Sequence, residues 1–336
     1  MSSIVILSGM RPTGKLHIGH FAGALENWVQ LQNEKDVNGN HLYQNFYLIA
    51  DYHSLTTNPT STDIFQHTID MVIDWLSAGI NPEESPIFRQ SQVKEHAELF
   101  LIFSMLITTS RLERNPSLKE QVRDLEMDTI AYGHLGYPVL QAADILLYKG
   151  NFVPVGEDQL PHVEITRELA RRFNQQYTLA KAVFPEPEPK LTKFSRLVGL
   201  DGKAKMSKSL GNTILLSDSP EEVQAKVRTA VTDPAKVRKN DPGNPDICTV
   251  FAYHKKFSTE PEIASIDSDC RTGTLGCVAC KKMCSESISR FLAPILETRA
   301  SITQEKVLEV LHDGESKARK VAATTMQQVH EAMKLG

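Results

Sequence analysis

The chain has 336 residues, of which 41% are hydrophobic and 23% charged, a composition typical of a soluble globular enzyme with room for two domains. Its formal net charge of −4 argues against a non-specific nucleic-acid binder, although a local basic stripe can still contact phosphates. No apolar run reaches the length of a membrane helix, and residues 1–7 lack the basic region of a signal peptide. We therefore expect a cytoplasmic protein that does not enter a membrane.

Apolar runs and helical patterns alternate along the first two-thirds of the chain. Buried strands are predicted at residues 4–7, 46–50 and 86–88. Amphipathic helices are predicted at about 17–34 and 61–78, the second with Ser61 or Thr62 as its N-cap. This alternation predicts an α/β fold with a Rossmann-like, doubly wound, mainly parallel sheet.

The last third of the chain has a different pattern. The prolines at Pro185, Pro187 and Pro189 predict a loop or boundary. Beyond about residue 215, helical periodicity replaces the buried strands, with candidate helices at 220–231, 281–297 and 304–333. A smaller helical domain is therefore expected after the α/β domain.

The first motif with a chemical meaning is His17-Ile18-Gly19-His20, which opens the helix after the first strand. In a doubly wound fold this is the ligand crevice, and a helix N-terminus attracts phosphate through its free N–H groups and its dipole. Gly19 lets a flat base approach the backbone, and His20 can hydrogen-bond phosphate oxygens. Alone, the tetrapeptide is equally compatible with two surface histidines at a helix start.

The second motif is Lys205-Met206-Ser207-Lys208-Ser209, in a loop that follows Asp201-Gly202. Two ammonium groups on a mobile loop can clamp a polyphosphate while it is transferred. Alone, the segment would be a solvated basic loop. The case for chemistry therefore depends on finding both motifs in one chain.

Together, in this order and about 185 residues apart, the motifs resemble the HIGH and KMSKS signatures of class I aminoacyl-tRNA synthetases. Within that class the chain is similar to tryptophanyl-tRNA synthetases over nearly its whole length, notably in residues 137–148, 153–159 and 162–170. The resemblance implies a Rossmann-like catalytic domain at 1–198 that includes a dimer-forming insertion. It also implies a KMSKS loop and helical anticodon-binding domain at 199–336, whose last helix can pack back on the catalytic domain.

The resemblance also assigns the site residues. Stabilisation of the reacting phosphates is assigned to His17, His20, Lys205 and Lys208. ATP contacts are assigned to Met10, Arg11, Pro12, Thr13, Gly19, His20, Gly156, Glu157, Asp158, Lys205, Met206, Ser207, Lys208 and Ser209. Contacts with the amino acid are assigned to Leu7, Tyr137, Gln141, Asp144 and Gln159.

A few residues decide which amino acid is expected. Asp144 would accept the indole N–H, because indole has one donor and no acceptor, and Tyr137 and Gln141 would hold the ammonium group. The same three residues also fit the Tyr-x3-Gln-x2-Asp pattern of tyrosyl-tRNA synthetases, and many tryptophanyl enzymes have Met at the position of Gln141. Leu7 favours tryptophan, because tyrosyl enzymes usually have a tyrosine there. Arg11 replaces a common Gln and adds a cation near the phosphates.

The resemblance implies that L-tryptophan is activated with ATP and Mg2+ to an adenylate and pyrophosphate, and is then transferred to tRNA(Trp) by a homodimer. The nearest alternative is a tyrosyl-tRNA synthetase. Another is a synthetase-like RNA-binding regulator that charges no tRNA, which degenerate motifs would signal. A different HxGH nucleotidyltransferase would lack residues 156–159 and the helical domain.

All five cysteines lie between Cys248 and Cys284. Cys248, Cys270, Cys277 and Cys280 could offer four thiolates to Zn2+ or to an iron–sulfur cluster, and a chain without metal is the remaining alternative. The arrangement resembles a subset of tryptophanyl enzymes with a [4Fe–4S] cluster, which would fix loops for contact with tRNA. Cys284 could replace Cys248 as a ligand, because positions 277, 280 and 284 share one helical face.

Overall fold

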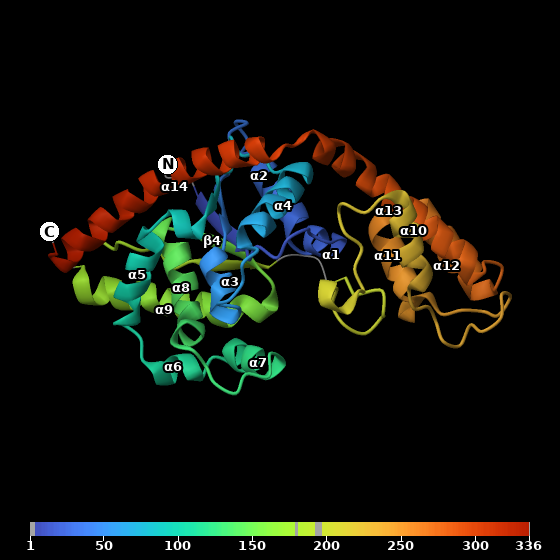
Figure 1. Cartoon of the computed structure of the whole chain (residues 1–336), viewed down its shortest axis with the longest axis horizontal. Helices are drawn as coiled ribbons and strands as arrows, with labels where there is room; N and C mark the ends of the chain where they lie inside the picture. Colours follow the sequence, from blue (N-terminus) through green and yellow to red (C-terminus); the bar gives the residue numbers. More distant parts are fainter. Residues whose placement is uncertain (1–3, 179–180, 192–196, 336) are drawn as a thin grey trace.

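The computed structural model describes residues 4–178, 181–191 and 197–335. Figure 1 shows one lobe built on a β-sheet and a second lobe of helices, with the long helix α14 (Gln304–Met333) extending over the sheet lobe. Residues 1–3, the start of the segment considered for a signal peptide, lie outside the described residues. No helix within the described ranges is long and apolar enough to cross a membrane.

The sheet has five parallel strands in the order β3-β2-β1-β4-β5. The strands are β1 (Ile4–Met10), β2 (Tyr43–Ile49), β3 (Ile87–Arg89), β4 (Phe152–Val155) and β5 (Glu188–Leu191). The direction of winding reverses between β1 and β4, so the ligand crevice of this doubly wound sheet lies at the carboxyl ends of those two strands. The predicted fold class is confirmed, and the three predicted strands are β1, β2 and β3.

The proline-rich stretch is only partly a loop, which corrects the prediction. Its second half forms the edge strand β5, in which Pro189 pairs with Val153. Proline has no N–H, and an edge strand tolerates that loss because only one of its sides is paired. Strand β4 also went unpredicted, because its four residues are too few to show a period.

The helices of the sheet lobe cover both faces of the sheet. They are α1 (Ile18–His20) continuing through a π-helical turn (Phe21–Leu25) into α2 (Glu26–Asn33), then α3 (Asp51–Thr57), α4 (Ile64–Ser77), α5 (Glu95–Ser104), α6 (Thr109–Glu113), α7 (Pro116–Asp124), α8 (Tyr132–Leu147) and α9 (Leu160–Tyr177). The predicted cap of α4 is wrong: Asp63 precedes the helix and its side chain makes no capping bond.

The second lobe is helical, as the periodicity predicted. Its helices are α10 (Pro220–Thr229), α11 (Thr249–Phe257), α12 (Glu260–Thr272) and α13 (Cys277–Ser301). Ser219 begins α10 with a reciprocal capping box to Glu222. Helix α14 occupies 304–333, the range that the sequence predicted.

The two lobes share apolar core. One buried cluster extends from Tyr47 and Ile49 of the sheet to Val223 of α10 and Ile288 of α13. Helix α14 then crosses β3 at Gly314, where an added Cβ would lie 2.0 Å from the Ile87 carbonyl oxygen. Only glycine therefore permits this close crossing. Next to it, Arg89 Nε lies 2.6 Å from Glu315 Oε1, a half-buried ion pair between strand and helix.

Candidate active site

A cavity of about 350 Å³ lies at the carboxyl ends of β1 and β4. It has the volume and position of a small-molecule site in a doubly wound sheet. All of the predicted amino-acid contacts line it, namely Leu7, Tyr137, Gln141, Asp144 and Gln159. Three predicted ATP contacts also line it, namely Met10, Arg11 and Gly156. Helix α8 contributes three of the amino-acid contacts because positions 137, 141 and 144 lie on one helical face.

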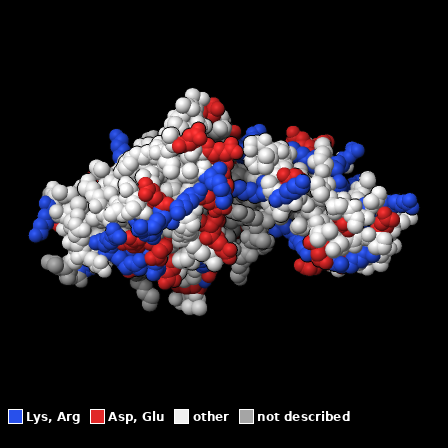
Figure 2. Space-filling model, turned by 90° about the horizontal axis from the view of Figure 1, so that it is seen from below, with Lys and Arg blue, Asp and Glu red and all other residues white. Residues whose placement is uncertain are grey.

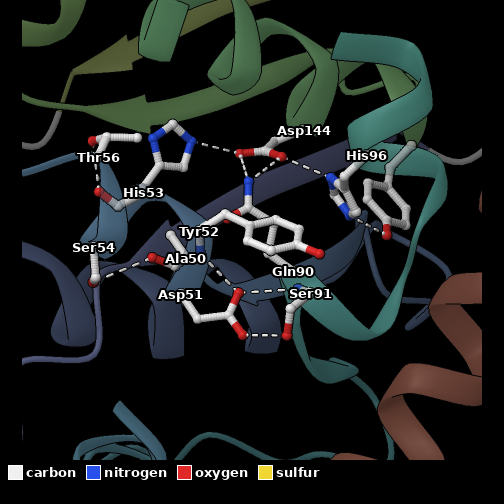
Figure 3. Close-up of polar contacts among 11 residues, drawn as sticks. Ala50, Asp51, Tyr52, His53, Ser54, Thr56, Gln90, Ser91, His96 and Asp144 are labelled. Atoms are coloured by element: carbon white, nitrogen blue, oxygen red, sulfur yellow. Dashed lines mark hydrogen bonds and ion pairs between the residues drawn. The ribbon is translucent and has the colours of Figure 1, made fainter. Parts of the chain in front are cut away.

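Asp144 lies at the buried end of the cavity, with its side chain 3% exposed. His53 Nε2 approaches Oδ2 at 2.9 Å, His96 Nδ1 approaches Oδ1 at 2.7 Å, and Gln90 Nε2 lies within 2.9 Å of both oxygens (Figure 3). Burial alone would raise the pKa of Asp144, but the hydrogen bonds from His53 and His96 outweigh it and lower that pKa to about 2. The cavity therefore holds a fixed negative charge near pH 7.

Two of the donors to Asp144, Gln90 and His96, were missed by sequence reasoning, whereas His53 stands just after a predicted strand and does line the cavity. His96 and Tyr148 are buried, and the Tyr148 hydroxyl lies 2.9 Å from His96 Nε2, on the side of the ring away from Asp144. Gln90 and His96 come shortly after strand β3 in the chain. Their position just after a predicted buried strand was the only signal for them in the sequence. Asp51, the first residue of α3, accepts from the backbone and hydroxyl of Ser91 and so has a structural role.

A second chain of polar groups supports Tyr137 at another wall of the cavity. The Tyr137 hydroxyl lies 2.7 Å from His162 Nε2, and His162 Nδ1 lies 3.1 Å from Gln159 Oε1. The Gln159 amide nitrogen in turn lies 3.0 Å from Asp158 Oδ2. Burial lowers the pKa of His162 to about 4. His162 is therefore neutral near pH 7 and joins two of the predicted substrate contacts.

The two histidines of the first motif cap their own helix. His17 Nδ1 accepts from the His20 backbone N–H, and His20 Nδ1 accepts from the His17 backbone N–H, each over 3.3 Å. Burial lowers the pKa of His17 to about 4 and that of His20 to about 3, so both rings are neutral near pH 7. Because each Nδ1 accepts, each ring carries its proton on Nε2 and offers a neutral N–H donor.

The structure brings the two sequence motifs together. Lys208 Nζ donates to the Thr13 carbonyl and, over 3.0 Å, to the Lys15 carbonyl. A Cβ added at Gly19 would lie 3.2 Å from Met206 Sδ, so the buried Met206 packs directly on the first motif. The Ile18 N–H donates to the Ile214 carbonyl over 2.9 Å, which ties the chain after the second motif to the same helix start.

The remaining predicted ATP contacts do not line the cavity. Pro12 is buried in the turn after β1, whereas Thr13, Lys205 and Ser209 are exposed, and Ser207 Oγ lies 2.9 Å from Ser209 Oγ. Glu157 and Asp158 are exposed at the short helical turn after β4. The positive charge of Lys205 contributes to the lowered pKa of His20, so this ammonium acts on the first motif.

Asp74 of α4 is a further residue that the sequence did not single out. It is fully buried, and its Oδ2 accepts from the Leu16 N–H over 2.6 Å. Its Oδ1 accepts from Arg299 Nε over 2.9 Å, at the end of α13. The Asp74 carboxylate therefore links Leu16, the residue before the first motif, to Arg299 near the end of α13 in the helical lobe.

The predicted metal ligands do not form a metal site as the described residues are placed. No group of three or more His, Cys, Asp or Glu side chains there is positioned to hold an ion. The thiols of Cys248, Cys270, Cys277 and Cys280 are nevertheless close enough for their charges to interact, which together with burial raises the pKa of Cys280 to about 12. Cys284 is fully buried in the apolar core, with Sγ 3.9 Å from the Val250 carbonyl oxygen.

Known proteins resemble this chain over its whole length. A family model for class I tRNA synthetases of tryptophan and tyrosine matches residues 1–293. The tryptophan–tRNA ligase of Thermotoga maritima is 51% identical, over 98% of this chain and 99% of that protein, and the one of Aquifex aeolicus is 41% identical over the same shares. A solved tryptophanyl-tRNA synthetase of Campylobacter jejuni, complexed with ADP and tryptophan, matches with a TM-score of 0.86 and 32% identity over 98% of this chain and 100% of that one.

The sheet is doubly wound with a cavity at its switch point, and the helix start that carries the HIGH motif contacts the KMSKS loop. This is the architecture of a class I aminoacyl-tRNA synthetase. The chain belongs to the class I tRNA synthetases of tryptophan and tyrosine, and within them to the tryptophan–tRNA ligases. The resemblance seen in the sequence is thereby confirmed for the family. The narrower subset with an iron–sulfur cluster is not shown.

Proposed function

We propose that this protein activates L-tryptophan with ATP to tryptophanyl-adenylate and pyrophosphate, and then transfers tryptophan to tRNA(Trp). One observation carries the proposal. A cavity with a buried carboxylate lies at the end of β1, and the histidine motif that follows β1 contacts the lysine motif. The cavity suits an amino acid with a single ring N–H donor, and the motifs suit a polyphosphate. A solved relative is complexed with tryptophan and with ADP, an adenine nucleotide like ATP.

At the amino-acid end, Asp144 accepts the indole N–H, and Tyr137 and Gln141 hold the ammonium group. Leu7, buried on β1, offers the aromatic ring an apolar surface, and Gln159 also lines the cavity. His53, which also lines the cavity, donates to Asp144 Oδ2 over 2.9 Å. A carboxylate oxygen accepts more than one hydrogen bond, so the indole N–H adds to or displaces this contact.

At the phosphate end, the substrate carboxylate attacks the α-phosphorus and pyrophosphate leaves, so no protein nucleophile is needed. The protein contributes position and charge. The neutral Nε2–H groups of His17 and His20 donate to phosphate oxygens, and Lys205 and Lys208 neutralise charge on the departing pyrophosphate. A Mg2+ ion bound with ATP would supply further positive charge there. Lys208 rests on backbone carbonyls of the turn before the first motif, so binding of ATP exchanges those carbonyls for phosphate oxygens.

The decisive experiment is ATP–pyrophosphate exchange with tryptophan, tyrosine or phenylalanine as the amino acid. Exchange that depends on tryptophan supports the proposal. Exchange with tyrosine would mean that Tyr137, Gln141 and Asp144 serve a tyrosyl enzyme. A folded protein that exchanges with none of them but binds tRNA would favour a non-charging RNA-binding role.

The helical lobe offers a basic groove for tRNA. The groove, with a volume of about 660 Å³, is lined by cations from the end of α10, the loop after it and the start of α13, namely Arg228, Lys236, Arg238, Lys239, Lys281 and Lys282. Across the face seen in Figure 2, by contrast, Lys and Arg are interspersed with Asp and Glu. We propose that the groove contacts the tRNA backbone near the anticodon. Arg238→Ala should raise the KM for tRNA and leave pyrophosphate exchange unchanged, whereas equal losses in both would contradict the assignment.

We also propose a homodimer formed through the segment between β3 and β4. Large apolar side chains with high exposed fractions gather there, namely Leu101 56%, Met105 68%, Leu125 51% and Tyr132 65%. Water-exposed apolar residues in one segment are typical of an interface. Analytical ultracentrifugation should give a dimer for the wild type and a monomer for Met105→Asp. A monomeric wild type would refute the proposal.

The four neighbouring thiols support a metal site as a further proposal, either a [4Fe–4S] cluster or Zn2+. The side chains of Cys248, Cys270, Cys277 and Cys280 are half-buried and near one another, whereas Cys284 lies in the core. The test is the iron, sulfide and zinc content of protein purified without oxygen. Cys277→Ser should lose the metal, and Cys284→Ser, the matched control, should keep it. A metal-free wild type would leave the cysteines with a structural role.

A further inference from the structure

The donor and the acceptor can be assigned in each hydrogen bond behind Tyr137, starting from the Asp158 carboxylate. A carboxylate oxygen accepts and cannot donate, so the Gln159 amide nitrogen must face Asp158. The Gln159 carbonyl oxygen then faces His162 Nδ1, which must carry the ring proton and donate it. Because burial keeps the His162 ring neutral near pH 7, its Nε2 has a lone pair and accepts. The Tyr137 hydroxyl is therefore the donor in the 2.7 Å bond to His162.

We propose that His162 is a positioning residue which turns the Tyr137 hydroxyl proton away from the cavity and so makes the Tyr137 oxygen an acceptor for the substrate ammonium group. The inference rests on the proposed function, which places that ammonium between Tyr137 and Gln141. An ammonium group has only donors, so it needs oxygen lone pairs aimed at it. Tyr137 lines the cavity, and His162 lies behind it on α9 with no exposed surface.

The arrangement explains why a buried imidazole is present where an apolar side chain would pack equally well. A hydroxyl without a partner would be free to point its proton into the cavity, against the ammonium donors. A charged imidazole would donate to the Tyr137 oxygen and place a positive charge behind the ammonium site. Only a neutral acceptor behind Tyr137 leaves its lone pairs to the substrate.

The test compares two ligands that differ at the ammonium group. L-tryptophan and indole-3-propionate share the ring and the carboxylate, and only tryptophan has the ammonium. Calorimetric titration without ATP should show that the wild type prefers tryptophan. In His162→Phe, which keeps a buried ring but no acceptor, tryptophan affinity should fall roughly tenfold or more, because a hydrogen bond to a charged group is lost. Affinity for indole-3-propionate should change less than about twofold, because that ligand makes no such bond.

Two conservative variants sharpen the comparison. His162→Gln can place an amide oxygen near the position of Nε2 and accept from Tyr137, so it should recover much of the preference for tryptophan. His162→Asn reaches only the position of Nδ1 and should not recover it. Tyr137→Phe should lose the preference as well, and adding His162→Phe to it should cost little more. Thr166→Val is the matched control, because this buried side chain on α9 donates to the His162 carbonyl over 3.0 Å and should leave the preference intact.

The possible outcomes separate this inference from the proposed function. Equal losses for both ligands in His162→Phe would mean that His162 only supports the cavity wall, and would overturn the inference. Should that variant not fold, equal ligand preferences in the Gln and Asn variants would overturn it too. A wild type that binds neither ligand would refute the proposed function itself, whereas tryptophan-dependent exchange with an unchanged preference in His162→Phe would refute only the role of His162.

Discussion

The two ends of the candidate site are built in different ways. The amino-acid cavity has walls from α8, α9 and adjoining strands, and its polar groups are supported by buried partners such as His96 behind Asp144 and His162 behind Tyr137. The phosphate end is assembled from segments nearly two hundred residues apart. There an exposed Lys208 rests on two carbonyls, and Met206 packs against Gly19.

This difference indicates that the two substrates are recognised by different physical means. A cavity whose side chains are held by buried bonds is formed before the ligand arrives, and ordering it on binding costs little. At the other end, Lys208 bonds to backbone oxygens. Under the proposed function it would have to give up those bonds to reach phosphates, so part of that site would form only with ATP present. Variants at the two ends should therefore separate catalysis from amino-acid binding.

The largest effect is expected at the phosphate end. Lys208→Ala removes the cation that the proposed function places beside the departing pyrophosphate, and we expect the rate of pyrophosphate exchange to fall by roughly 100- to 1000-fold. The affinity for tryptophan without ATP should stay within about twofold, because the cavity is held by other partners. Lys203→Ala, an exposed lysine of the same loop, is the matched control and should retain full exchange. A comparable loss of tryptophan affinity in Lys208→Ala would show that the two ends are not independent.

The next effect lies at the amino-acid end. Asp144→Asn replaces an acceptor-only group with one that also donates, opposite the donors of His53, His96 and Gln90. Tryptophan affinity should fall roughly 10- to 100-fold, while the KM for ATP changes little. Circular dichroism would verify the fold, and Asp63→Asn, at an exposed residue just before α4, serves as a charge-matched control. An unchanged KM for tryptophan would remove Asp144 from the substrate site.

Local motifs made the phosphate end easier to predict than the support of the cavity. His17–His20 and Lys205–Ser209 are contiguous, so the sequence displays them directly, and α14 was predicted to its ends because its period continues over many turns. His96 and His162 were not assigned roles, because each is a single buried histidine, and the tyrosine hydroxyl that it contacts lies on another helix or at its end, 52 residues away for His96 and 25 for His162. Asp74 was likewise missed, since only the fold brings Leu16 and Arg299 to the same carboxylate.

A smaller effect should appear in stability as the pH falls. The pKa of His17 and of His162 is about 4 and that of His20 about 3 in the folded protein, all lowered by burial from 6.5. The unfolded chain therefore binds protons that the folded chain does not, and the free energy of unfolding decreases as the pH falls from about 6.5 towards 4. Each of these histidines lowers the free energy of unfolding by at most about 1.4 kcal/mol per pH unit.

Thermal denaturation between about pH 7.5 and pH 5 measures this effect at both ends of the site. The Tm should be steady above about pH 7 and should fall progressively below about pH 6.5. His162→Gln removes one titrating ring from the cavity side and should make the fall shallower. A Tm that rises on acidification would contradict the assignment of neutral buried histidines.

The smallest effect should come from the contact between the helical lobe and the helix that begins with the first motif. Lys256 Nζ of α11 lies 2.5 Å from Glu26 Oε2 of α2, with the two side chains 13% and 24% exposed. Lys256→Met keeps the apolar stem and removes the charge, so the free energy of unfolding should drop by about 1 kcal/mol. Pyrophosphate exchange should fall less than about threefold, because Lys208 and the backbone pairing near Ile18 still hold the motifs together. Lys306→Met, whose partner Glu309 is exposed, is the control for a solvent-screened pair and should change neither quantity. If Lys256→Met also weakened tryptophan binding, the cavity would depend on the helical lobe, and the separation between the two ends of the site would have to be abandoned.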